Sequence, residues 1–470
     1  MLEWPRLLSD SRCSELFSGH RGSRGARDSR SEFERDYGRL LFCAPVRRLS
    51  AKAQVFPLEP EDFVRTRLTH SLEVSNVARD MAWQAGRLLL KQHSVGLSHD
   101  DVSHMATIAA TCGLIHDLGN PPFGHAGELA ISSWFAARSE SDPILKSFAE
   151  CEEALAAEFS PFEGNAQATR LLTRLQPAVH GWSLDLTFAI LSAAGKYLAS
   201  AVEVEEDGRH EYSKNGFFRS EADVVKAVRE ATGTVGQRHP LTYLVEAADD
   251  IVYTTVDVED SVKKGILTWQ EVERELGADV HGSEVFHAAI ERAHQIVNMV
   301  VPETRAQHQE FATAFRTSAI GEFVPAVIEI FIRRYDVIMH GEYHGELVMD
   351  EECRARSLIR ACKQLLRRTV YRSPSVLGLE ILGRQVIHGL MDLFWEGVCE
   401  FDPTKQDVKS YGRKIYNLFS ANYRSVFEQR LADGVENETY VKLQLVIDQV
   451  AGMTDAYACS TYRQLTLPPR

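Results

Sequence analysis

The segment His116-Asp-Leu-Gly-Asn-Pro-Pro-Phe-Gly-His-Ala-Gly-Glu128 decides how the rest of the chain can fold. The run before it, residues 102–118, is almost entirely small or apolar. This predicts a buried helix that must stop at Gly119 and the two prolines after it. His116 and Asp117 are therefore expected in the last turn of a buried helix. A histidine beside a polar residue is also common in protein cores, so this pair alone leaves a purely structural role open.

Two neighbouring segments place further ionisable groups on helices. Residues 69–92 predict a helix whose buried stripe opens on His70, because apolar residues follow His70 at helical spacing. His125 and Glu128 are three residues apart, so a helix that begins near Gly124 carries both on one face. The sequence thus predicts several proton-moving or metal-binding side chains at the ends of buried helices.

Residues 240–260 give the clearest helical pattern in the chain. Asp249, Tyr253 and Asp257 recur every fourth residue and share one face with apolar neighbours. Carboxylates on an apolar stripe are costly unless they are paired or bind a metal. The alternative is an exposed acidic helix edge that also includes Glu246, Asp250 and Glu259.

The pattern as a whole predicts a mostly α fold with at most a small β-hairpin. Further expected elements are helices over 32–49, within 142–180, over 184–200 and from 265 onward, and a hairpin turn at Asp207-Gly208. Because no Pro/Ser/Gly-rich linker or internal repeat divides the chain, we expect one globular unit. Its expected parts are an Arg-rich arm (1–31), a core (32–270) and a helical C-terminal region that completes the same unit (271–470).

Composition excludes several classes of protein. The chain has 470 residues, 44% of them hydrophobic, and no apolar run approaches the length of a membrane-spanning helix, so no membrane association is expected. The N-terminus lacks the pattern of a secretory signal, and the eight cysteines form no Cys-x-x-Cys pair. Reduced thiols and a cytoplasmic location are therefore expected.

The net charge of −14 argues against binding nucleic acid over the whole surface. Basic residues are instead concentrated near the N-terminus: Arg21, Arg24, Arg27, Arg30, Arg35, Arg39, Arg47 and Arg48. They form either a solvated, salt-bridged arm or an arm that faces phosphates or another subunit.

Two imidazoles and two carboxylates, those of His70, His116, Asp117 and Asp249, form a mixed nitrogen and oxygen set. Such a set suits a divalent ion of the Mg, Mn, Fe, Co, Ni or Zn type and leaves positions for water or a substrate oxygen. No thiolate belongs to this set, which argues against a structural Cys-rich zinc site.

The order His, His-Asp, Asp resembles the HD-domain metal phosphohydrolases, and within them the bacterial deoxyguanosinetriphosphate triphosphohydrolase (dGTPase-like) family. The similar stretches are Gln54-Val-Phe-Pro, Arg65-Thr-Arg-Leu-Thr-His-Ser-Leu-Glu-Val, residues 116–128, Phe162-Glu-Gly-Asn-Ala-Gln, Glu246-Ala-Ala-Asp-Asp-Ile-Val-Tyr and Ala451-Gly-Met-Thr-Asp. The resemblance implies an HD-domain helical fold with additional C-terminal helices. It also implies hydrolysis of a dNTP, with dGTP favoured, to deoxynucleoside and tripolyphosphate.

The resemblance further implies a role for each site residue. His70, His116, Asp117 and Asp249 would hold the metal, Mg²⁺ or Mn²⁺ before Co²⁺, Ni²⁺, Fe²⁺ or Zn²⁺, and His125 with Glu128 would form the catalytic pair. Gln54 and Asp257 would bind the 3′-hydroxyl, Tyr253 would pack on the deoxyribose, and Arg67, Lys196 and Tyr197 would contact the triphosphate. Asn165, beside a Gly in a predicted turn, is expected in the substrate pocket. A homo-oligomer, in this family a hexamer, is expected as well.

Two departures concern the outer contacts. Ala456 follows Gly-Met-Thr-Asp where relatives usually carry arginine, and Gly195-Lys-Tyr lacks the proline expected next. The alternatives are another HD phosphohydrolase such as a nucleotidase, or a regulator that senses dNTPs or binds single-stranded DNA. Single-stranded DNA or a dNTP could also act as an effector of the hydrolase.

Overall fold

The computed structural model describes residues 1–19, 28–58, 61, 63–91, 96–176, 183–205, 208–280, 282–298, 303–402, 409–434 and 437–466. Within these residues the chain is helical and contains no strand, so the predicted mostly α fold is confirmed. Three isolated bridges join Arg12 to Thr187, Ala53 to Thr66 and Ala199 to Asn215. No helix among these residues is long and apolar enough to cross a membrane.

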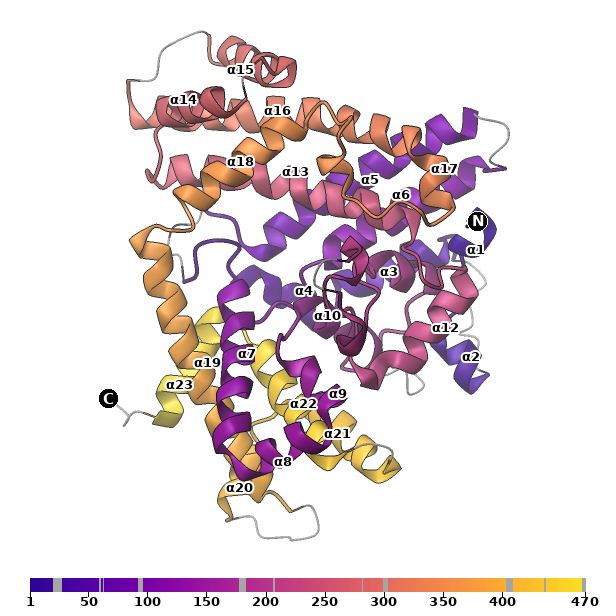
Figure 1. Ribbon diagram of the computed structural model, residues 1–470, viewed down its shortest axis with the longest axis vertical. Coiled ribbons are helices and arrows are strands. Elements are labelled where there is room, and N and C mark those ends of the chain that lie inside the picture. The colour runs from indigo at the N-terminus through magenta and orange to yellow at the C-terminus, as the bar shows by residue number, and fades with distance from the viewer. Residues whose placement is uncertain are drawn as a thin grey trace.

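Four long helices form the centre of the molecule: α5 (Arg67–Lys91), α6 (His99–Ile115), α13 (Pro240–Lys263) and α16 (Arg305–Arg333). α5 packs along α6, and α13 packs against α5, α6 and α16 (Figure 1). The approach of α5 to α6 is close because Gly113 has no side chain, and a Cβ there would lie 2.8 Å from the Cα of Ser75. The Ser75 hydroxyl also donates to the carbonyl of Ala110 at 2.7 Å. This contact brings the start of α5 next to the end of α6.

The helix breaks after α6, and α7 (His125–Ser141) begins directly after Gly124, as the glycine and proline pattern predicts. α6 begins at a capping box formed by Ser98 and Asp101 and ends at Ile115. His116 is the C-cap residue of α6, so His116 and Asp117 lie just beyond the helix and not within its last turn.

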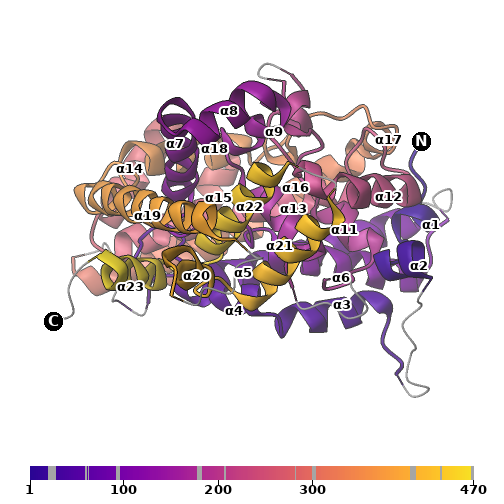
Figure 2. The same cartoon turned by 90° about the horizontal axis from the view of Figure 1, so that it is seen from below.

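The C-terminal helices surround α7. α7 packs on α8 (Pro143–Cys151) and α19 (Pro374–Glu400), and α19 packs on α20 (Tyr411–Tyr416), α22 (Glu438–Ala451) and α23 (Asp455–Thr466). α21 (Ala421–Asp433) lies on α22. Figure 1 shows these helices together in the lower half of the view, and Figure 2 shows the orange and yellow helices α19 to α23 from below. One continuous apolar core extends from Leu2 to Ala458 and joins this region to the central helices.

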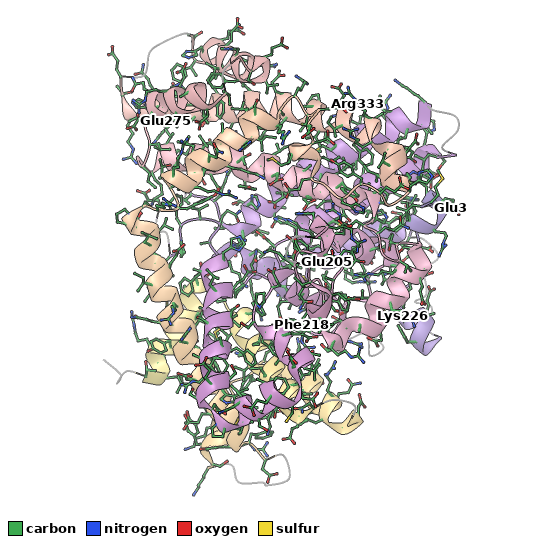
Figure 3. The ribbon with its side chains drawn as sticks, in the orientation of Figure 1. Glu3, Glu205, Phe218, Lys226, Glu275 and Arg333 are labelled. Carbon is green, nitrogen blue, oxygen red and sulfur yellow. The ribbon has the colours of Figure 1, made fainter. Side chains whose placement is uncertain are left out.

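The remaining helices are shorter. They are α1 (Trp4–Leu7), α2 (Cys13–Ser18), α3 (Glu32–Leu41), α4 (Ala44–Arg48), α9 (Glu153–Ala156), α10 (Gly164–Thr173), α11 (Phe188–Ala194), α12 (Ala222–Thr232), α14 (Trp269–Asp279), α15 (Glu284–Ile296), α17 (Tyr335–Met339) and α18 (Arg356–Arg368). The 3-10 turns are η1 (Leu49–Ala51), η2 (Ala157–Phe159), η3 (Ala201–Glu203), η4 (His210–Tyr212), η5 (Arg219–Glu221) and η6 (Leu347–Met349). Charged side chains such as Lys226, Glu275 and Arg333 project from the periphery, whereas Phe218 is buried (Figure 3).

Two predicted helices are shorter than expected. The helix predicted over 32–49 breaks between α3 and α4, because Pro45 begins a new helix and supplies no N–H to continue the first. The helix predicted over 184–200 is reduced to α11, because Asp185 adopts a φ of 48°. The Asp185 carboxylate accepts bonds from Ser14, a long-range contact that local periodicity does not encode.

The predicted hairpin around 202–218 is not found among the described residues, and Asp207 itself lies outside them. The described part of this segment forms η3, η4 and a single bridge from Ala199 to Asn215. Its side chains bind other elements instead of a partner strand, since His210 pairs with Glu246 and Glu211 pairs with His344.

The predicted Arg-rich arm is only partly described, because Arg21, Arg24 and Arg27 lie outside the described residues. Three of the described arginines form salt bridges within the chain: Arg30 and Arg35 pair with Asp28, and Arg39 pairs with Asp36. The salt-bridged interpretation therefore holds for these three, whereas Arg48 donates to the hydroxyl of Tyr423.

Candidate active site

A cavity of about 660 Å³ opens between α13, α18, the start of α7 and the loop around Gln54. Every predicted site residue except His70 lines it: Gln54, Arg67, His116, Asp117, His125, Glu128, Asn165, Lys196, Tyr197, Asp249, Tyr253 and Asp257. His70 lies fully buried beneath the wall, where its Nε2 is 3.0 Å from Oδ1 of Asp249. The volume is typical of a small-molecule site.

The histidines and aspartates predicted to bind a metal form one cluster. Candidate ligand atoms of His70, His116 and Asp117 all lie within 4.8 Å of one another. Nε2 of His116 is 3.5 Å from Asp249 and 3.6 Å from Asp117, and it is buried without a hydrogen bond. Nδ1 of His116 lies 2.8 Å from the carbonyl of Gly113, to which it donates, so Nε2 is the nitrogen left to bind either a proton or a cation beside the carboxylates. A buried nitrogen without a partner, among carboxylate oxygens, fits a divalent cation.

The charges of this cluster depend on one another. Burial disfavours a charged His116, but attraction to Asp117 and Asp249 outweighs burial and raises the His116 pKa to about 9. Burial also opposes ionisation of both carboxyls, yet Arg67 and the histidines lower the pKa of Asp117 to about 2 and that of Asp249 well below its usual value. The carboxylates are therefore ionised at neutral pH and attract either a proton or a cation.

Both oxygens of Asp117 are held from outside the cluster. Arg67 donates to Oδ2, and the amide of Asn120 donates to Oδ1 at 2.5 Å. Arg67 is thus placed against a predicted metal ligand as well as on the cavity wall.

His125 and Glu128 lie next to this cluster, at the first turn of α7. The side chain of His125 is 86% exposed and projects into the cavity, with Nδ1 2.6 Å from Oε2 of Glu128. Glu128 is buried and accepts a second bond from the N–H of Gly164 at 2.8 Å. The hydrogen bond that His125 donates to Glu128 raises the pKa of His125. Burial favours a neutral Glu128, but the same hydrogen bond outweighs burial and lowers the pKa of Glu128. A protonated His125 therefore has its second N–H free to face the cavity.

The predicted row on α13 continues from the cluster along the wall. Asp249, Tyr253 and Asp257 all face the cavity, and the hydroxyl of Tyr371 donates to Oδ2 of Asp257 at 2.9 Å. Burial raises the pKa of Asp257 to about 8 despite this bond. Nearby, Oε1 of Gln54 is buried without a hydrogen-bond partner.

The interpretation of α13 as an exposed acidic edge is wrong. Glu246, Asp250 and Glu259 are all less than a tenth exposed. Each carboxylate binds a basic side chain: Arg238 for Glu246, Lys363 for Asp250 and Arg65 for Glu259.

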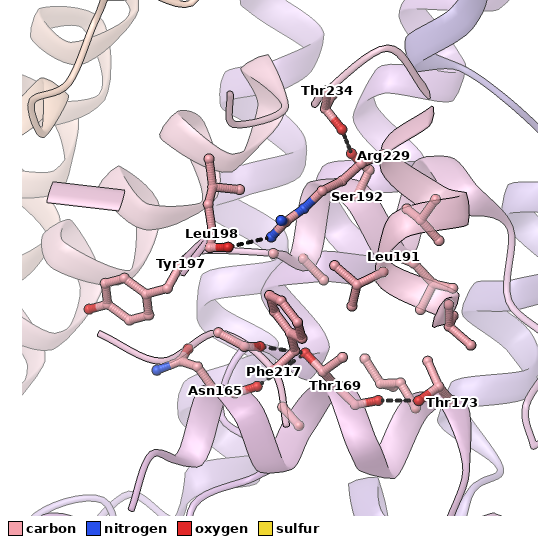
Figure 4. A pocket seen from close by; sticks show the side chains of 18 of the residues that line it. Asn165, Thr169, Thr173, Leu191, Ser192, Tyr197, Leu198, Phe217, Arg229 and Thr234 are labelled. Carbon is pink, nitrogen blue, oxygen red and sulfur yellow. Dashed lines mark hydrogen bonds between the residues drawn. The ribbon is translucent and has the colours of Figure 1, made fainter. Parts of the chain in front are cut away.

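The basic end of the cavity contains Lys196, whose ammonium is 3.4 Å from Glu246 and 5.5 Å from the ring centre of Tyr197. The ammonium of Lys214 is 5.9 Å from the ring centre of Tyr197 and pairs with Glu163 at 2.9 Å. Asn165 and Tyr197 also line a smaller apolar pocket of about 70 Å³ behind them (Figure 4).

Several cavity residues were not predicted from the sequence. They are Asn120, Lys214, Lys363, Arg367 and Tyr371. Lys363 and Arg367 are four residues apart on the strongly amphipathic α18, a spacing that signals a shared face but does not reveal which helix that face meets. Nothing local marks Tyr371, because its role depends on α18 packing against α13.

Comparison with known proteins agrees with this geometry. Residues 67–178 match the HD domain, and residues 400–464 match the phosphohydrolase-associated domain. The fold and the cavity define an HD-domain phosphohydrolase, and hence a hydrolase.

Full-length relatives narrow the class. The chain is 34% identical over 477 residues to a deoxyguanosinetriphosphate triphosphohydrolase-like protein of Listeria monocytogenes, covering 99% of both chains. It is 32% identical to a like-named Synechocystis protein, again over 99% of both chains. The deoxyguanosinetriphosphate triphosphohydrolase of Yersinia pseudotuberculosis is 31% identical, over 92% of this chain and 93% of its own. The protein belongs to the deoxyguanosinetriphosphate triphosphohydrolase-like family.

Proposed function

We propose that this protein hydrolyses deoxynucleoside triphosphates, dGTP first among them, to deoxynucleoside and inorganic tripolyphosphate. The observation that carries the proposal is the single cavity that joins the His and Asp cluster, the His125–Glu128 pair and the polar end at Asp257. In the proposed complex the His and Asp cluster would face the phosphate, the His125–Glu128 pair the leaving oxygen, and the end at Asp257 the sugar. The names of the relatives support dGTP as the base to test first.

His70, His116, Asp117 and Asp249 would hold a divalent cation, Mg²⁺ or Mn²⁺. When bound, the ion supplies Lewis-acid polarisation of water and of an α-phosphate oxygen. The side chains provide the charge balance for it, because two carboxylates with low pKa values face two imidazoles. Arg67 keeps Asp117 oriented and adds positive charge beside the α-phosphate.

His125 is the proton donor in the proposed reaction. The oxygen of water forms a bond to the α-phosphorus, the bond from phosphorus to the 5′-oxygen breaks, and the second N–H of His125 protonates that oxygen. The water oxygen leaves in the tripolyphosphate, and the proton lost by water restores His125. Glu128 raises the pKa of His125 and fixes which nitrogen faces the substrate.

The sugar would lie along α13. Asp257 and Gln54 would bind the 3′-hydroxyl, for which Gln54 has a buried oxygen without a partner. The ring of Tyr253 would pack where a 2′-hydroxyl would otherwise sit, which favours deoxyribose. Lys196, Tyr197 and Asn165 would contact the phosphate tail at the basic end.

The relation to partners belongs to the same proposal. We expect a homo-oligomer, a hexamer by family resemblance, that works in the cytoplasm with its cysteines reduced, and all eight are free thiols in the fold. Single-stranded DNA or a second dNTP would act as an effector. Mass measurement in solution and activity with each effector test these points.

Glu128→Ala tests the proposed function at its catalytic pair. Turnover should fall about 100-fold or more, because His125 loses the group that orients it and raises its pKa. The matched control is Glu140→Ala, which changes an exposed glutamate on the same helix and should leave turnover unchanged. Full turnover by Glu128→Ala with dNTP substrates would refute the assigned role.

A further inference from the structure

The C-terminal helices reach the active site through one carboxylate, that of Asp455 at the start of α23. Asp455 is 3% exposed. Its Oδ2 accepts the backbone N–H of Ala53 at 2.9 Å, and its Oδ1 accepts the backbone N–H of Phe123 at 3.0 Å. One side chain therefore binds two loops that are seventy residues apart in the sequence.

The loop that contains Phe123, called the catalytic loop here, leads directly into His125 of the catalytic pair. Phe123 and Gly124 both have positive φ, 65° and 59°, immediately before His125. A positive φ is unfavourable for phenylalanine, so the surrounding contacts must hold it. The Asp455 bond to the Phe123 N–H is such a contact, and it acts two residues before His125.

The loop that contains Ala53, called the sugar loop here, lines the cavity where the sugar is proposed to bind. Ala53 is adjacent to Gln54, and it forms a bridge with Thr66 next to the start of α5. The N–H of Arg67 donates to the carbonyl of Lys52 at 3.0 Å, which ties the same loop to Arg67. Asp455 thus closes a connection between the sugar loop, the catalytic loop and the helix that carries His70.

Lys52 adds two more contacts to this junction, by which we mean the contacts of Asp455 and Lys52 that join the two loops to the C-terminal helices. Its buried ammonium donates to the carbonyl of Asn120 at 2.5 Å and to the carbonyl of Ala451 at 2.9 Å. The catalytic loop is therefore held at Asn120 by Lys52 and at Phe123 by Asp455. Ala451 ends α22, so both contacts join this loop to the C-terminal region.

We infer that Asp455, supported by Lys52, is a positioning residue that sets the catalytic loop and the sugar loop together, and so couples the C-terminal helices to the reaction. The effect on turnover rests on the proposed function, whereas the effect on the two loops does not. Asparagine at this position keeps one acceptor oxygen but turns an NH₂ group toward the other backbone N–H. At least one loop then loses its acceptor.

The test compares Asp455→Asn with Asp433→Asn, the same chemical change at an exposed position on another C-terminal helix, α21. Hydrogen exchange followed by mass spectrometry should show amide exchange at least about tenfold faster in peptides covering residues 50–58 and 119–126. Peptides from the middle of α5 and α13 should not change. The value of kcat/KM for a dNTP should fall about 10- to 100-fold through a lower kcat and a higher KM, because one loop carries His125 and the other carries Gln54.

Unchanged exchange in both loops would overturn the inference, and so would a uniform rise over all peptides, which a merely structural role produces. Hydrogen exchange in the loops is measured without substrate. If the wild-type protein fails to hydrolyse dNTPs, the proposed function is refuted, but the exchange data still test the role of Asp455 in holding the loops. If Asp455→Asn does not fold, Lys52→Met removes the bond to Asn120. It should then speed exchange in the 119–126 peptide, and no change there would count against the junction.

Discussion

Replacing Asp257 by asparagine should make the protein more stable and a poorer enzyme. The Asp257 side chain is 3% exposed, and burial raises its pKa to about 8 although the bond from Tyr371 opposes the shift. Asparagine has nearly the same shape and keeps an acceptor for the Tyr371 hydroxyl. It also needs no proton to stay neutral in this buried position.

The sign and size of the effect follow from the two protonation states. An unfolded aspartate has a pKa of about 3.9, whereas folded Asp257 has a pKa of about 8. The native state therefore binds the extra proton, and the stability of the wild type falls as pH rises between these values and then levels off. At about 1.36 kcal/mol per pKa unit the limit is roughly 5 kcal/mol. Water in the cavity reduces it, so we expect about 1 to 3 kcal/mol at about pH 8.5.

Thermal unfolding of both proteins at about pH 5 and about pH 8.5 measures this difference. For 470 residues the unfolding entropy is about 1 kcal/mol/K, so Asp257→Asn should raise the Tm by about 1 to 3 °C at the higher pH. The gain should shrink to about a quarter at the lower pH. The value of kcat/KM should fall at least about tenfold, because asparagine lacks the carboxyl group that is proposed to bind the 3′-hydroxyl. An equal gain at both pH values, or a loss at the higher one, would refute a buried and protonated Asp257.

Three further substitutions test other parts of the site. Asp249→Ala should remove bound metal, measured by elemental analysis after dialysis, and lower turnover by about 100-fold or more; unchanged metal content would contradict its role as a ligand. Tyr253→Ala should lower the preference for dNTP over NTP about tenfold by opening space for a 2′-hydroxyl, and an unchanged ratio of kcat/KM values would contradict the proposed packing. Gly113→Ala should cost about 1 to 3 kcal/mol in chemical unfolding, because its Cβ would lie 2.8 Å from Ser75, and an unchanged midpoint would show that α5 and α6 can separate freely.

Local chemistry predicted the parts of the site that lie on single helices. Asp249, Tyr253 and Asp257 share a face by spacing alone, and that face lines the cavity. Glycine and proline predicted the break between the helix that precedes His116 and the helix that begins near His125, and the structure has this break. These features need no information about other elements.

The features that the sequence did not predict depend on contacts between segments that are distant in the sequence. α11 is short because Asp185 binds Ser14. Lys363 and Arg367 line the cavity because α18 packs on α13. Asp455 belongs to a stretch that the sequence singled out, but its partners are the backbone N–H groups of Ala53 and Phe123. Backbone groups are the same in every residue except proline, so they leave no mark in the sequence.

The most direct test of the proposed reaction is the identity of its products. Purified protein with Mg²⁺ or Mn²⁺ is given each dNTP and each NTP separately, and the products are resolved by anion exchange. Deoxynucleoside and intact tripolyphosphate from dNTPs alone, with dGTP fastest, is the predicted result. Deoxynucleoside monophosphate with pyrophosphate, or no product from any dNTP even with mixed dNTPs and single-stranded DNA added, would contradict it.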